Sequence, residues 1–357
     1  MVRKLIFPVI LGAATAPCWA QGSVTLSGLI DGGVSYVSNQ AGGRSLKFDD
    51  GIVVPNLLMF TGKEDLGDGT SAVFDLKTQF DIGTGEFIPG QSLFSRTAYL
   101  GLDNPQYGRL TFGNQYDFMF DSLVIGFNDA AYYAGLYATR NGPFDKLALP
   151  NNPTGAFDWD RAAGLALPNT VKYQSPVLGG FSAGAMYGFG NVPGSIGTGN
   201  ASSFALNYVN GGFGANAAYT LAKTAAEGVQ ASVRNWGVGA HYNFGPVTGS
   251  ALFTTVHNSA NGGGIWQGEL GGTWKINNSL TFTAAYSYMK GNDVLDNNHA
   301  NQISGMLQYV LSIRTSVYAQ AVYQRANEGA NAQINGVFVP SSSASQFITR
   351  VGMTTLF

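Results

Sequence analysis

The stretch Leu280-Thr281-Phe282-Thr283-Ala284-Ala285-Tyr286-Ser287-Tyr288 decides the fold, because apolar and polar side chains alternate along it. Successive side chains of a β-strand point to opposite faces of the sheet. In an extended chain, Leu280, Phe282, Tyr286 and Tyr288 therefore share one face, whereas the threonines and Ser287 share the other. One face suits lipid and the other suits water.

The same alternation recurs along most of the chain, for example over residues 235–244, 266–275 and 302–309. We count about sixteen such segments, which start near residues 23, 56, 70, 94, 107, 168, 180, 202, 213, 232, 246, 264, 279, 301, 313 and 346. At about ten residues each, tilted segments of this kind are long enough to span the hydrocarbon layer of a membrane.

Connections between the segments alternate between short and long. Residues 244–246, 276–279 and 311–313 are tight turns, whereas residues 191–200, 257–264, 292–301 and 328–345 are long polar loops. Lipid cannot satisfy backbone N–H and C=O groups, so a lipid-facing sheet has to close on itself. The pattern predicts an all-β protein, a 16-stranded antiparallel transmembrane β-barrel with both termini at the turn end.

The amino-acid composition weighs against a secreted β-protein and against a disordered chain. Only 11% of the 357 residues are charged, glycine accounts for 49 of them, and aromatic residues make up 13%. A secreted β-sandwich or β-propeller would also alternate, but its water-facing surface would need more charge. The aromatic content excludes intrinsic disorder.

The first twenty residues have the organisation of a secretory signal peptide. Arg3 and Lys4 precede a short apolar stretch, and small side chains flank a cleavage point after Ala20. A lipoprotein signal at Cys18 and an ordinary buried helix are the alternatives. We predict a cleaved signal peptide over 1–20 and a single barrel domain over 21–357, with 17 basic against 21 acidic side chains and no cysteine.

An ordered set of short motifs resembles the general porins of β-proteobacteria, which are trimeric 16-stranded outer-membrane barrels. The resemblance covers the chain from Ser23 to Phe357, and the motifs are residues 23–31, 62–69, 94–102, 107–113, 169–176, 311–315 and 351–357. It implies a homotrimer among outer-membrane lipids and lipopolysaccharide. It also implies that Phe357, with Val351 and Met353 at alternate positions, is the signal read by the barrel-assembly machinery.

The segment between residues 116 and 168 is far longer than a turn requires. The resemblance implies that this third loop folds into the lumen and narrows the pore. Its charged side chains are Asp117, Asp121, Asp129, Arg140, Asp145, Lys146, Asp158, Asp160 and Arg161. Its aromatic side chains are Phe118, Phe120, Phe127, Tyr132, Tyr133, Tyr137, Phe144, Phe157 and Trp159.

The opposite wall departs from the family pattern at three places where basic residues are usual. Leu57, Met59 and Thr61 occupy lumen positions of the second strand, Asn114 follows Gly113, and residues 166–168 contain no arginine. The remaining wall charges are those of Lys63, Asp75 and Lys77, with Arg96 and Arg109 as further candidates. The predicted constriction comprises Leu57, Met59, Thr61, Lys63, Asp75, Lys77, Asn114, Asp117, Asp121, Asp129, Arg140 and Arg161.

The function expected from the resemblance is passive diffusion of small hydrophilic solutes and ions. Three missing arginines favour a pore with weak anion preference that admits neutral or partly apolar solutes, unless Arg140 or Arg161 replaces the lost charge. A substrate-selective channel with a binding site at the constriction is the main alternative, and a surface adhesin or receptor is another.

Other chemistry has little basis in the sequence. The three histidines, His241, His257 and His299, form no catalytic or metal-binding pattern with neighbouring residues. Runs of Lys and Arg, which nucleic-acid binding requires, are missing. We therefore expect no enzyme activity, no cofactor and no metal site.

Overall fold

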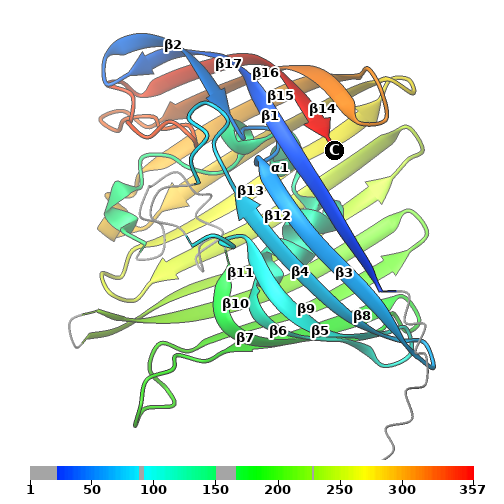
Figure 1. Ribbon diagram of the computed structural model, residues 1–357. Coiled ribbons are helices and arrows are strands. Elements are labelled where there is room, and N and C mark those ends of the chain that lie inside the picture. The colour runs from blue at the N-terminus through cyan, green and yellow to red at the C-terminus, as the bar shows by residue number, and fades with distance from the viewer. Residues whose placement is uncertain (1–21, 88–91, 150–165, 227–228) are drawn as a thin grey trace, which may run out of the picture.

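A computed structural model describes residues 22–87, 92–149, 166–226 and 229–357. They form one antiparallel sheet that closes into a barrel, with short helical segments inside it (Figure 1). The predicted signal peptide and Arg161 lie outside the described residues.

Strands of eight to eighteen residues build the wall. The first half of the chain contributes β1 (Ser23–Gln40), β2 (Gly43–Asp50), β3 (Leu57–Gly67), β4 (Thr70–Gln79), β5 (Thr97–Asn104), β6 (Gly108–Gln115), β7 (Leu167–Gln174), β8 (Phe181–Gly188) and β9 (Ala201–Asn210). The second half contributes β10 (Phe213–Ala226), β11 (Val229–Asn243), β12 (Val247–Asn258), β13 (Gly264–Lys275), β14 (Leu280–Gly291), β15 (His299–Val310), β16 (Thr315–Ala326) and β17 (Ser345–Leu356).

Two of the named strands, β2 and β3, act as one interrupted strand. β2 pairs with the second half of β1, and β3 pairs with residues 23–29 of the first half. Residues 51–56 separate them. The wall therefore has sixteen strand positions, which confirms the predicted fold class. The other sixteen strands all begin within three residues of the expected positions, whereas β2 was not foreseen.

The barrel closes where the last strand meets the first. β17 pairs with β1 in the register Leu29↔Leu356 to Val37↔Ile348. One residue beyond the Leu29↔Leu356 pair, the backbone N–H of Gly28 donates to the carbonyl of Phe357, and the N–H of Phe357 donates to the carbonyl of Gly28. The seam brings the start of the barrel and its end to the same rim, so the closed sheet leaves no free edge.

Alternation along the strands divides the wall into two faces. In β16, Ser316, Gln320 and Gln324 are buried toward the interior, whereas Val317 and Tyr323 lie on the other face. β14 shows the same division, with Thr283 and Ser287 inward and Phe282 and Tyr286 outward. The outer face is apolar, and rings on β11 to β14 contact one another around it, as in the interfacial aromatic belts of membrane proteins.

Short helical segments occupy the connections. The segment after β6 contains η1 (Met119–Asn128), α1 (Ala130–Tyr133), η2 (Leu136–Ala138) and η3 (Asp145–Leu147), and η4 (Asp293–Leu295) lies between β14 and β15. Among the residues that the structure describes, no helix combines the length and the apolar character needed to cross a membrane.

Candidate functional site

The described part of the third loop contacts the inner face of the wall on several sides. The backbone N–H of Phe118 donates to Ser203 on β9 at 3.0 Å, and that of Ala131 donates to Glu269 on β13 at 3.1 Å. The side chain of Gln302 on β15 donates to the carbonyl of Ala138 at 2.6 Å. β9, β13 and β15 are separated by other strands of the wall, so the segment that contacts all three crosses the interior of the barrel.

The wall contacts lie near the middle of the strands. Glu269 is the sixth residue of the twelve in β13, and Gln320, which donates to the carbonyl of Ala134, is the sixth of the twelve in β16. Figure 1 shows α1 within the barrel rather than at a rim. The helical segments therefore reduce the open cross-section at about half depth.

A buried ion cluster fixes the loop to β13. Arg140 donates from Nη1 to Glu269 Oε2 at 2.8 Å and to Asp129 Oδ1 at 3.1 Å, and its Nη2 contacts the other oxygen of Asp129. All three side chains are at most 1% exposed. Two carboxylates around one guanidinium make a buried charge tolerable, because each charge has hydrogen-bonded partners.

Apolar packing and a second ion pair fix η1 to the adjoining part of the wall, between β7 and β12. Met119 and Leu123 join a buried cluster with Leu252 of β12 and alanines of β9 and β10. Lys172 on β7 pairs with Asp121, and its Nζ also donates to the carbonyl of Tyr116 at 2.8 Å. The start of the loop is thus held by both charge and packing.

A third cluster lies at the barrel seam and includes the loop residue Tyr137. Arg350 on β17 pairs with Asp49 on β2 and, at 3.4 Å, with Asp31 on β1. Tyr318 donates to Asp31 at 2.5 Å, and Tyr137 donates to Asp49. This network joins the first and last strands and attaches the loop to both.

The wall not covered by these loop contacts carries half of the predicted constriction residues. Strand register places Met59 opposite Lys77 and Thr61 opposite Asp75, on the same face as Asp31. Lys77 and Asp75 form a salt bridge of 2.9 Å, with 26% and 11% of their side chains exposed. Leu57 and Lys63 share this face, at its buried and exposed ends respectively.

The remaining predicted residues are dispersed. Asn114 on β6 pairs with Ala98 on β5, at positions that alternate with the inward ones. Its side-chain amide donates hydrogen bonds to the carbonyls of Phe94 and Ser95. The pairing of β6 with β7 shifts register at this point, between Gly113 and Gln115. Asp117 is buried and accepts the N–H of Phe120 at 3.1 Å, near the start of η1.

Arg140 does not replace the missing wall arginines, because it is fully buried between carboxylates. Sequence reasoning missed Glu269, Lys172 and Arg350 as anchoring residues. A signal existed for Glu269 and Arg350, since each is a charge at an inward position near the middle of its strand, with uncharged residues around it.

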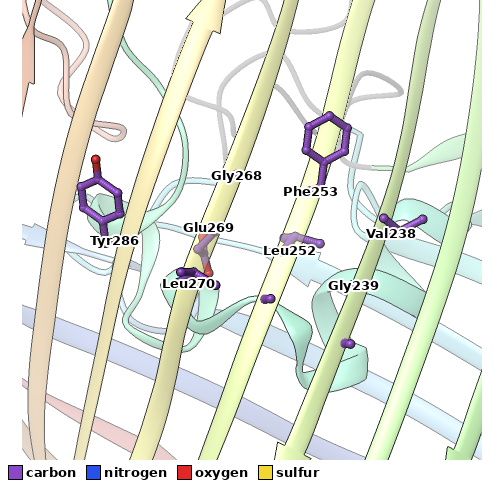
Figure 2. A pocket seen from close by; sticks show the side chains of 10 residues that line it. Val238, Gly239, Leu252, Phe253, Gly268, Glu269, Leu270 and Tyr286 are labelled. Atoms are coloured by element: carbon purple, nitrogen blue, oxygen red, sulfur yellow. The ribbon is translucent and has the colours of Figure 1, made fainter.

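Figure 2 shows the wall beside the loop anchor, where a shallow hollow opens on the outer face of β11 to β14. Val238, Phe253, Leu270 and Tyr286 line it from outward positions. Leu252 and Glu269 face the loop from the other side of the same strands. The hollow faces the lipid rather than the lumen and lies off the solute path.

Comparisons with known proteins agree with this architecture. The sequence profile of the Gram-negative porin family matches residues 9–329. The chain belongs to the Gram-negative porin family.

Similar proteins cover nearly the whole chain. An outer membrane porin protein of Bordetella pertussis is 27% identical over 82% of this chain and 80% of its own length. Outer membrane porin protein 32 of Delftia acidovorans is 26% identical over 98% of both chains. In structure, the anion-selective porin from Comamonas acidovorans has a TM-score of 0.78 at 23% identity, covering 94% of this chain and 100% of its own.

This protein is therefore an outer-membrane porin of Gram-negative bacteria. Its barrel forms a water-filled channel through which small hydrophilic solutes and ions diffuse passively, as predicted. It is a channel and not an enzyme. Sequence motifs thus identified the family correctly.

Proposed function

We propose that the constriction of this porin favours neutral and partly apolar small solutes and has only weak anion preference. We place the constriction between the uncovered wall (Leu57, Met59, Thr61, Lys63, Asp75 and Lys77) and the loop near Asp121. Charged rings at a constriction determine which ions pass, so the balance of charge across this gap is the relevant quantity.

Paired charges support the proposal. Lys77 is paired with Asp75, Lys172 with Asp121, Arg140 with Asp129 and Glu269, and Arg350 with Asp31 and Asp49. The water-facing pair of Lys77 and Asp75 carries the argument, because a cation held 2.9 Å from a carboxylate presents little net field to a passing anion.

Reversal potentials across a salt gradient in planar bilayers test the proposal. The wild-type channel should show weak anion preference. Asp75→Asn should increase that preference by leaving Lys77 unpaired, and Lys77→Gln should shift selectivity toward cations. Lys146→Gln is a matched control, because the Lys146–Asp296 pair is 62% and 56% exposed and lies outside the constriction. Strong anion selectivity in the wild type would contradict the proposal.

The solved porin from Comamonas acidovorans is described as anion-selective. We therefore expect this chain to differ in ion selectivity from a structural neighbour of the same fold. The difference is argued from Leu57, Met59 and the Lys77–Asp75 pair, all on one inward face of β3 and β4.

We also propose that the protein assembles as a homotrimer in contact with outer-membrane lipids and lipopolysaccharide. A solved trimer form of OmpT of Vibrio cholerae has a TM-score of 0.66 at 15% identity, over 94% of this chain and 99% of its own. Gel electrophoresis of unheated protein, with light scattering of the detergent-purified particle, tests the trimer. A monomeric mass would contradict it.

The C-terminal residues are proposed as the signal for the barrel-assembly machinery. Val351, Met353 and Phe357 are 60%, 50% and 48% exposed at the end of the last strand. Deletion of Phe357 should reduce the amount of assembled barrel in the outer membrane. Normal assembly after that deletion would exclude the proposed role.

A further inference from the structure

Aromatic rings of the third loop form a connected series inside the barrel. Phe127 and Tyr133 are stacked, with ring centroids 5.4 Å apart and an interplanar angle of 5°. Tyr132 meets Tyr133 edge-on at 5.7 Å, and Phe120 meets Tyr132 in the same way. On the wall side, His241 of β11 lies 6.1 Å from the ring of Phe127.

Phe127 is the most unusual member of this series. It is 59% exposed, although it lies in a segment whose neighbours pack against β9 to β12. Its backbone has φ 64° and ψ 16°, the left-handed region that bulky side chains rarely adopt. Such strain persists only where surrounding contacts enforce it, and it concentrates at functional positions. Here the strained residue presents an apolar ring to the interior of a water-filled channel.

The neighbouring contacts hold this pair of rings in place. The hydroxyl of Tyr133 donates to the carbonyl of Ile125 at 3.2 Å. Asn128, next to Phe127, bonds to Asn216 at 2.8 Å and to the ring of His241 at 2.9 Å. The rings are therefore fixed before any solute arrives, which lowers the entropic cost of binding.

Burial raises the pKa of Tyr133 to about 12, with Tyr132 and Asp129 adding to the effect. The phenol is therefore uncharged over the physiological range. Phe127 is 59% exposed, so a planar solute can reach this neutral pair and add a further aromatic contact to it.

We propose that Phe127 and Tyr133 form a stacking site for planar aromatic solutes in the pore. The inference rests on the proposed preference of the constriction for neutral, partly apolar solutes, and it names their class. Binding of this kind is weak, as conduction requires, because a solute has to leave the site as readily as it enters.

Blocking of the open channel by matched probes tests this site. Benzamide and cyclohexanecarboxamide carry the same amide, but only benzamide has a planar aromatic ring. Each is added to the purified protein in planar bilayers, and the half-blocking concentration is read from the current and its fluctuations. Benzamide should block at a concentration severalfold lower than cyclohexanecarboxamide does.

Two variants test whether the rings of Phe127 and Tyr133 cause the block by benzamide. Phe127→Leu and Tyr133→Leu keep apolar side chains but remove one ring each, and each should raise the half-blocking concentration of benzamide by about fivefold. Phe204→Leu is the matched control, since Phe204 is a half-exposed aromatic residue on the outer face of β9. It should leave blocking unchanged.

Equal potency of the two probes in the wild type would overturn the inference without use of any variant. Stronger block by the saturated ring would also overturn it and would indicate a site for sugar-like rings. Unchanged benzamide block in both loop variants would exclude these two residues. Reversal potentials measured without a probe report the charge balance separately, so failure of the stacking site and failure of the proposed selectivity are distinguishable.

Discussion

Arg140 in the third loop and Glu269 in the middle of β13 form an ion pair of 2.8 Å that is closed off from water. They are 129 residues apart in the chain. The pair, completed by Asp129, attaches a helical segment to the wall at about half depth of the channel. Because buried charges require each other, the position of the loop depends on every member of this cluster.

Glu269→Ala should loosen the loop. Removing one partner of a buried ion pair costs about 3–5 kcal/mol, because the other charge stays buried without compensation. We expect larger single-channel conductance, greater current noise and faster entry of large sugars in liposome swelling. Glu269→Gln, which keeps a hydrogen-bond acceptor, should show a smaller change. Wild-type conductance and noise in Glu269→Ala would show that the cluster does not hold the loop.

Arg350→Gln should weaken the seam of the barrel. Arg350 connects β17 with Asp31 and Asp49, so its loss removes a charge partner from each of two inward carboxylates. Asp49 keeps a second partner, Lys47, at 3.2 Å. We expect a loss of about 3–5 kcal/mol of stability. The measurement is the temperature at which the folded band disappears in electrophoresis of heated samples. Arg314→Gln, at an exposed turn, should melt like the wild type.

Gly28→Ala should disturb the C-terminal residue. A Cβ at Gly28 would lie 2.1 Å from the ring of Phe357, so the ring would have to move. Overpacking of this kind costs about 1–3 kcal/mol. Gly268→Ala is the control, because a Cβ there meets no atom within 4 Å. We expect lower thermal stability and slower folding into detergent for Gly28→Ala only, and equal behaviour of the two variants would contradict the contact.

Gly184→Ala should displace the start of the loop. Gly184 lies on the inner face of β8, and a Cβ there would approach the ring of Phe118 to 2.2 Å. Phe118 is buried next to Lys172, whose Nζ lies 4.6 Å from its ring centroid. We expect altered conductance with an intact barrel, as measured by unchanged far-UV circular dichroism. Unaltered conductance would show that the loop tolerates a shift of Phe118.

The course of the chain through the wall could be predicted from the sequence, and β2 shows where the prediction stopped. Arg44, Leu46 and Phe48 alternate with Ser45 and Lys47, but this short charged stretch was not among the expected segments. Its strand character depends on pairing with β1, which period-two alternation alone did not reveal. Local pattern is weakest in short segments, where pairing partners decide the structure.

The candidate site was predicted less completely than the wall. Alternation placed Met59, Thr61, Asp75 and Lys77 on one face, as the register has them. The pairing of Arg140 with Glu269, and the contacts of Asn114 with the carbonyls of Phe94 and Ser95, did not follow from the sequence. Contacts between residues that are separated in the chain depend on three-dimensional packing.

By itself, the sequence determined that this chain forms a barrel, because a lipid-facing backbone has to satisfy its hydrogen bonds within a closed sheet. Period-two alternation also assigned the outer and inner faces. Only the tertiary structure decided where the third loop lies and which of its charges face water. Those features come from contacts between residues far apart in the chain, such as Tyr137 with Asp49 and Arg140 with Glu269, and no local pattern encodes such contacts.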